Sequence, residues 1–120
     1  MAVALPLEGN QLRRTAELPP PVAAAIDAAN AGDIGAFLAS FTSGGVVDDW
    51  GREFIGPEQI AAWSEKEFIG VQVALQVVDV KSSAGETIVT AEVGGNGFNG
   101  PSHFVFRVKR ERVSRMAIRA

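Results

Sequence analysis

The spacing of hydrophobic residues changes near residue 70 and divides the chain into two parts. Before this point, apolar residues recur every three or four positions, as on one face of an amphipathic helix. After it, apolar and polar residues alternate, which is typical of strands with one buried face. Helices followed by a run of strands predict an α+β domain, in which one curved antiparallel sheet carries helices on one side.

Three helices are predicted in the first part of the chain. Their starts are marked by residues that suit a helix beginning, namely Pro21, Asp33 and Pro57. Gly32 provides a stop for the first of them. The predicted helices cover residues 21–31, 34–41 and 57–68.

Six strands are predicted, two short ones on either side of Gly51 and four long ones after residue 70. They cover residues 46–50, 52–55, 71–80, 86–93, 102–111 and 112–120. A turn is expected at residues 42–45, and the glycine-rich residues 94–100 predict a turn or a bulge. Residues 1–18 are weakly periodic and end before three prolines, so we expect a flexible N-terminal arm followed by one domain over residues 19–120.

Composition excludes several classes of function. The 120 residues include no cysteine and one histidine, which argues against disulfides, thiolate catalysis and metal sites, and no cofactor is expected. The net charge is −3, and the basic residues near the C-terminus alternate with apolar ones, so no nucleic-acid partner is expected. No segment approaches the roughly 18 apolar residues of a membrane span, and a cytoplasmic location is the default prediction.

Two adjacent acids, Asp48 and Asp49, end the first short strand in the segment VVDDWGREFIG. Adjacent residues of a strand point to opposite faces. One carboxylate is therefore expected in solvent and the other on the side that the strand covers. Asp49 in an apolar cavity would suit a general base, and its alternative is an ion pair with an arginine such as Arg52.

The order of elements, together with several short motifs, resembles the NTF2-like superfamily and, within it, the SnoaL-like and ketosteroid-isomerase-like proteins. The motifs are Asn30-Ala31-Gly32-Asp33, Val47-Asp48-Asp49, Gly56-Pro57-Glu58-Gln59-Ile60 and the terminal strand RVSRMAIRA. The resemblance covers roughly residues 19–120. It implies a cone in which a curved, mixed or antiparallel sheet wraps around three N-terminal helices and encloses a hydrophobic cavity. This fold also hosts proteins with no catalytic activity.

The resemblance also implies roles for individual residues. Asp49 takes the position of the general base of the steroid isomerases, and Asp48 is then expected to face outward. The position of the tyrosine that stabilises the oxyanion falls at Ala25, and the chain contains no tyrosine. The second oxyanion donor, a late aspartate, aligns with His103. Strand alternation places His103 on the outer face of the sheet with Val105, whereas the gapless alignment places it in the cavity as a partner of Asp49.

These observations predict a SnoaL-like protein that binds a small apolar molecule, with Trp50, Trp63, Phe68 and Phe98 as candidate walls of the pocket. Its chemistry would be of the isomerase or cyclase type, with Asp49 and His103 acting on a cyclic or keto compound without metal. Hydration or dehydration is a further option. The alternative is a module without catalysis that binds a ligand or associates through its sheet, and a homodimer through the sheet face is expected.

Overall fold

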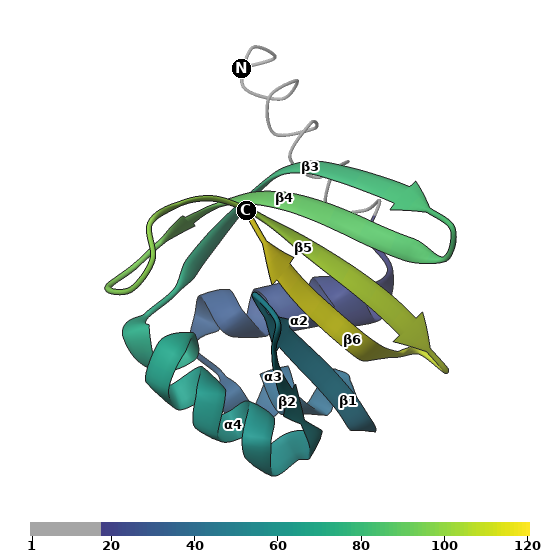
Figure 1. Cartoon of the computed structure of the whole chain (residues 1–120), viewed down its shortest axis with the longest axis horizontal. Coiled ribbons are helices and arrows are strands. Elements are labelled where there is room, and N and C mark those ends of the chain that lie inside the picture. The colour runs from purple at the N-terminus through teal and green to yellow at the C-terminus, as the bar shows by residue number, and fades with distance from the viewer. Residues whose placement is uncertain (1–17) are drawn as a thin grey trace, which may run out of the picture.

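The computed structural model describes residues 18–120, which form three α-helices, one short 3₁₀ helix and six strands (Figure 1). The helices are α2 (Pro20–Ala31), α3 (Ile34–Ala39), α4 (Gly56–Glu67) and the 3₁₀ helix η1 (Ile69–Val71). The strands are β1 (Phe41–Asp49), β2 (Arg52–Ile55), β3 (Ala74–Ser83), β4 (Glu86–Gly94), β5 (Gly100–Lys109) and β6 (Arg112–Arg119). No helix of this part of the chain is long and apolar enough to cross a membrane.

The six strands form one mixed sheet in the order β2-β1-β6-β5-β4-β3. Strands β3 to β6 follow one another as an antiparallel meander, and β1 and β2 form a separate hairpin. The hairpin joins the meander through β1 and β6, which run parallel to each other. A contact between the first and the last strand therefore completes the sheet.

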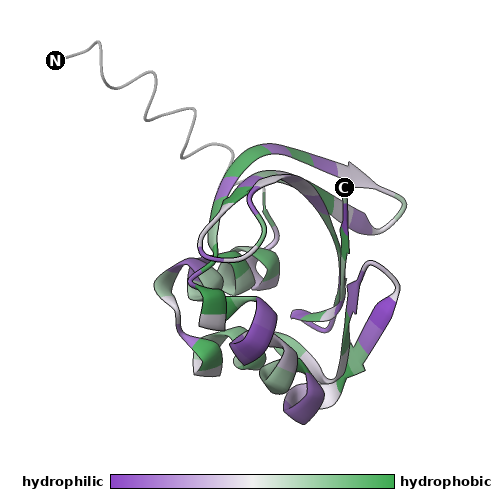
Figure 2. Ribbon diagram, turned by 60° about the vertical axis from the view of Figure 1, so that its left-hand side comes forward, coloured by the Kyte–Doolittle hydropathy of each residue, from purple (hydrophilic) through white to green (hydrophobic). Residues whose placement is uncertain are grey.

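The sheet curves around the three helices, which lie inside the curve (Figures 1 and 2). Alternation along the strands supplies the core: Val47, Phe104 and Met116 are almost fully buried on the inner face. On the helices, Val22, Phe37 and Ile60 are buried in the same cluster. The expected α+β cone, an open curved sheet wrapped on three N-terminal helices, is confirmed.

The motif around Asn30 ties the first helix to the sheet. The Asn30 side-chain amide donates to the carbonyl of Leu75 at 3.0 Å and accepts from the N–H of the same residue at 2.6 Å. Gly32 ends α2 with φ of 70°, and the Asp33 carboxylate caps α3 by accepting from the N–H of Ala36. The local caps at Gly32 and Asp33 end one helix and begin the next, and the long-range contact of Asn30 holds α2 against β3.

Several boundaries differ from the prediction, among them the end of the second helix, predicted at residue 41 and found at Ala39. Residues 42–45 are not a turn but belong to β1, where the pairing with β6 shifts between Phe41 and Val46. The third helix ends one residue early, because Phe68 leaves the helical conformation and η1 follows. Strand β3 consequently begins at Ala74 rather than at residue 71. In this corner a side chain at Gly70 would collide with the backbone of Glu65, so the tight turn excludes larger residues.

The expected arm over residues 1–18 lies outside the described residues except for Leu18. This side chain is 8% exposed and packs in the hydrophobic core ahead of α2. Leu18 therefore packs with the domain that was predicted to begin at residue 19.

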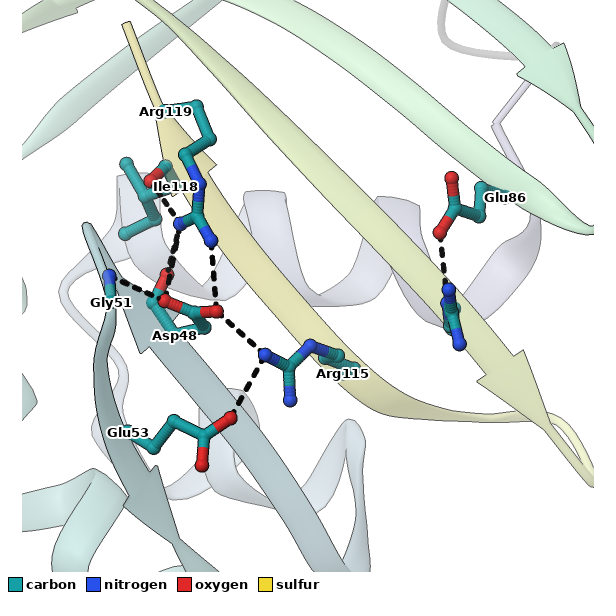
Figure 3. A network of polar contacts seen from close by, with 8 residues as sticks. Asp48, Gly51, Glu53, Glu86, Arg115, Ile118 and Arg119 are labelled. Carbon is teal, nitrogen blue, oxygen red and sulfur yellow. Dashed lines mark hydrogen bonds and ion pairs between the residues drawn. The ribbon is translucent and has the colours of Figure 1, made fainter.

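The prediction that Asp48 lies in solvent is wrong. Asp48 does point to the outer face of the sheet, but only 5% of the residue is exposed. Its carboxylate accepts from Arg115 at 2.6 Å, from both terminal nitrogens of Arg119 at 2.9 and 3.1 Å, and from the N–H of Gly51 at 2.7 Å (Figure 3). Arg115 also pairs with Glu53 on β2. The two arginines, which are about 70 positions later in the sequence, thus cover the carboxylate and connect β6 to β1 and β2.

These contacts stabilise the charged form of Asp48. The hydrogen bonds from Arg119, with those of Gly51 and the positive charge of Arg115, lower the pKa of Asp48 to about 2, although burial opposes the shift. The same pairing raises the pKa of Arg119. On acidification, the Asp48 carboxyl takes up its proton at a higher pH in the unfolded chain than in the folded protein. The stabilisation that these contacts give above about pH 4 is therefore lost as the pH falls toward 2.

We expect the Asp48→Asn variant to lose less stability on acidification than the wild type. Chemical denaturation of both proteins at pH 7 and pH 2 would measure this difference. A pKa of about 2 in place of 3.8 corresponds to about 2 kcal/mol of free energy of unfolding that the wild type loses and the variant does not. Equal losses in the two proteins would contradict the role of the ion pairs.

Candidate functional site

A cavity of about 320 Å³ lies at one end of the inner face of the sheet, between the sheet and the C-terminal part of α4. Its size is at the lower end of the range of small-molecule sites, roughly 300–1,000 Å³. Strand β1 and the turn after it, the end of α4, η1, the segment before β3, the β4–β5 loop and strands β4 to β6 all contribute to its wall. The lining residues are Asp49, Trp50, Trp63, Lys66, Glu67, Phe68, Val71, Val73, Val93, Gly94, Gly97, Phe98, Ser102, Phe104 and Ile118.

Asp49 is the acid that strand alternation directs into this cavity. It pairs with Ile118 across the β1–β6 ladder, and both side chains line the cavity. Its Oδ2 accepts from the indole N–H of Trp63 at 3.1 Å and from the guanidinium of Arg52 at 2.5 Å. Among residues 18–120, Oδ1 has no hydrogen-bond partner, so one carboxylate oxygen remains available to a ligand.

Arg52 joins two acids at the edge of the cavity. Besides Asp49 it binds Glu67, with contacts of 2.6 and 3.1 Å between the guanidinium nitrogens and the carboxylate oxygens. This pairing raises the pKa of Arg52 and lowers the pKa of Glu67. The ion pair with Arg52, expected as the alternative environment of Asp49, is therefore present together with the cavity position.

Stacked aromatic side chains form the helix side of the cavity. The rings of Trp63 and Phe68 lie 4.9 Å apart with an interplanar angle of 23°, and the ring of Phe54 stacks on the other side of Trp63 at 6.0 Å. Phe68 also contacts Phe104 on the sheet, at 6.5 Å between ring centroids. Trp63 and Phe68 are buried, so they present a fixed, flat apolar surface to the cavity.

Trp50 and Phe98 lie at the rim, and each is 60% exposed. Trp50 and Gly51 form a two-residue hairpin turn between β1 and β2, with φ of 55° and 92°. Such turns favour asparagine or glycine at the first position, and a tryptophan there is strained. Strained residues that persist tend to cluster at functional sites, which makes Trp50 a candidate for contact with a ligand.

His103 does not lie in the cavity, so its predicted place beside Asp49 is wrong. It is exposed on the outer face of the sheet, where it pairs with Arg119 in the ladder, and its Nδ1 lies 2.9 Å from the hydroxyl of Thr90. Because β5 continues in phase through Phe104 and Phe106, which face inward, alternation directs His103 outward. Of the two expected positions, the structure agrees with strand alternation and not with the gapless alignment.

Ser102, the residue before His103, occupies the inner face instead. It is 4% exposed and lines the cavity. Sequence reasoning missed it, although the inward phase of Phe104 and Phe106 would have indicated it. Ala25, the position of the missing tyrosine, is buried in α2 and does not line the cavity. Neither oxyanion donor implied by the resemblance is therefore found in the cavity: position 25 is an alanine that does not line it, and His103 lies on the outer face of the sheet.

Comparisons with known proteins test the fold. No family model and no curated protein matches the sequence. Among solved structures, a provisionally assigned polyketide cyclase from Sinorhizobium meliloti superposes with a TM-score of 0.77, with 24% identity over 88% of this chain and 98% of that chain. A protein from Catenulispora acidiphila with a ketosteroid-isomerase-like fold, in complex with trimethylamine, superposes with a TM-score of 0.72 and 19% identity over 85% of each chain. The chain has the NTF2-like fold.

A third NTF2-like neighbour comes from Mycobacterium tuberculosis and is in complex with estradiol-17beta-hemisuccinate. It superposes with a TM-score of 0.68 and 16% identity over 82% of this chain and 88% of that chain. At these identities the likeness establishes the NTF2-like fold, and it confirms the resemblance expected from the sequence motifs at that level.

The two tryptophans provide a direct test of the cavity wall, because both line it and the chain has no tyrosine. We expect the Trp50→Phe variant, which retains the buried Trp63, to fluoresce at shorter wavelength and to resist quenching by acrylamide. The Trp63→Phe variant, which retains the exposed Trp50, should be quenched strongly. Equal quenching of the two variants would contradict the described wall.

Proposed function

We propose that the protein binds a small, mainly apolar molecule in the cavity beside Asp49. The observation that carries this proposal is the combination of a flat, buried aromatic wall with a carboxylate that keeps one oxygen free. Apolar cavities with a few placed polar groups are the usual form of small-molecule sites. Trp63 and Phe68 favour a planar ligand, since stacked rings pack best against flat apolar surfaces.

Two solved neighbours support the choice of ligand class. The Mycobacterium tuberculosis protein is in complex with a steroid derivative, and a computationally designed protein that binds 17-OHP superposes with a TM-score of 0.71 and 16% identity over 83% of this chain and 87% of that chain. These ligands belong to those proteins. They indicate that this fold can accommodate fused-ring molecules, and we propose the same class for this chain.

A cyclic ketone such as 2-tetralone is a suitable first probe, and isothermal titration calorimetry measures its binding. We expect Phe98→Ala to weaken binding about fivefold, because about 1 kcal/mol of apolar contact at the rim is lost. Ile55→Ala is the matched control, since Ile55 is also a large exposed hydrophobic side chain and does not line the cavity. Equal effects of the two substitutions would contradict binding at this site.

The free oxygen of Asp49 favours a second, catalytic function. We infer that Asp49 acts as a general base on the carbon next to a carbonyl group of the bound ligand. Oδ1 takes the proton, the electron pair of the C–H bond forms a carbon–carbon double bond, and the carbonyl electrons move to oxygen to give an enolate. In a β,γ-unsaturated ketone the enolate extends over the double bond, and return of the proton from Asp49 to the γ-carbon completes an isomerisation. In a cyclisation the enolate carbon attacks a second carbonyl group, and the alkoxide formed there takes the proton back from Asp49. Neither route needs a metal or a cofactor.

Exchange of the α-protons of 2-tetralone for deuterium, followed by NMR in D₂O, tests this step. We expect the wild type to accelerate the exchange and Asp49→Asn to abolish the acceleration while affinity for the ketone remains, since an amide does not accept the proton. His103→Ala is the control and should exchange at the wild-type rate, because His103 lies on the outer face. Acceleration that survives in Asp49→Asn would retire the base assignment and leave a binding protein without catalysis.

The remaining expectations concern partners and location. Association of two copies through the outer face of the sheet remains a prediction from the resemblance, as does the cytoplasmic location. On that face Asp48, Glu53 and Glu86 are paired with arginines of the same chain (Figure 3). A partner copy would therefore meet a surface of paired charges.

A further inference from the structure

Ser102 is buried, and its side-chain hydroxyl has no hydrogen-bond partner among residues 18–120. Its exposed fraction is 4%, and it lines the cavity. In the described part of the chain, no side-chain nitrogen or oxygen is both fully enclosed and unpartnered. The Ser102 hydroxyl must therefore face open space, and the space that Ser102 borders is the cavity.

Other buried serines of the protein are satisfied internally. The hydroxyl of Ser40 donates to the carbonyl of Ala36 at 3.0 Å, and the hydroxyl of Ser64 accepts from the N–H of Ile69 at 3.4 Å. A buried hydroxyl without a partner is destabilising. The lining residue nearest to Ser102 along β5 is Phe104, an apolar side chain, so a bound molecule is a suitable partner for this hydroxyl.

We propose that the Ser102 hydroxyl binds an oxygen atom of the ligand, and that this contact selects cyclic compounds with a carbonyl or hydroxyl group. The inference rests on the proposed binding function and adds the polar group that the ligand must carry. A hydroxyl can donate to a carbonyl or accept from an alcohol, whereas the aromatic wall can do neither.

The position of Ser102 also indicates the size of the ligand. Ser102 lies on β5 and Asp49 on β1, and β6 separates these two strands in the sheet. Two strand spacings amount to roughly 10 Å. A ligand that reaches both groups therefore needs the length of a fused-ring system, with one oxygen toward Ser102 and, at the opposite end, the carbonyl group next to the carbon that faces Asp49.

A pair of probes that differ by one oxygen tests this inference. The affinities of 2-tetralone and of tetralin, its hydrocarbon analogue, are measured by NMR titration for the wild type, Ser102→Ala, Ser102→Thr and Thr87→Val. Thr87, on β4, is the matched control. Like Ser102 it is buried, and its hydroxyl has no hydrogen-bond partner among residues 18–120, but it does not line the cavity.

We expect Ser102→Ala to weaken binding of 2-tetralone about fivefold, the usual effect of one neutral hydrogen bond, and to leave tetralin binding as tight as in the wild type. Ser102→Thr keeps a hydroxyl and should retain most of the affinity for the ketone. Thr87→Val should change neither affinity.

Two other results would overturn the inference and are distinguishable from each other. If both probes bind the wild type and Ser102→Ala affects them equally, or affects neither, the hydroxyl does not bind the oxygen, and the binding function stands. The same conclusion follows if Thr87→Val reproduces the loss. If neither probe binds the wild type, the proposed binding function fails and the role of Ser102 fails with it.

Discussion

The ion pairs of Asp48 with Arg115 and Arg119 are the constraint on which the site depends. They hold β1 against β6, the one parallel pairing that joins the hairpin to the meander. Because neighbouring residues of a strand face opposite ways, fixing Asp48 on the outer face directs Asp49 into the cavity. A buried ion pair adds little net stability over an apolar contact, but loss of one partner is costly, so this arrangement is more important for geometry than for energy.

Much of this could be predicted from the sequence, and the failures have a common cause. Local signals near Pro21, Asp33 and Pro57 were sufficient to predict the helix starts to within one residue. Strand alternation predicted that one of the two acids faces inward, and the resemblance indicated Asp49, which lines the cavity. The burial of Asp48 depends on arginines about 70 residues later, and no local pattern shows that two distant strands will lie side by side. For His103, the alternation of its own strand was correct and the gapless alignment was not, because neighbouring residues of a strand face opposite ways.

The position of Ser102 in the cavity wall was not predicted from the sequence either. Its neighbours Phe104 and Phe106 mark the inner face of β5, yet a serine on that face carries no signal of its own until the cavity next to it is known. The backbone strain at Trp50 could not be predicted from the sequence, because its φ of 55° follows from the two-residue turn between β1 and β2. The residues that distinguish this chain within a common fold are therefore those whose roles arise from tertiary contacts.

The two faces of the sheet differ: on the outer face, paired charges position the strands, and on the inner face, an apolar wall with Asp49 and Ser102 borders the cavity proposed to bind a ligand. A crystal structure of the protein with 2-tetralone would test this account most directly. The account predicts the ketone against Trp63 and Phe68, with its oxygen within hydrogen-bond distance of Ser102. A ketone bound elsewhere, or a cavity closed by the aromatic side chains, would contradict it.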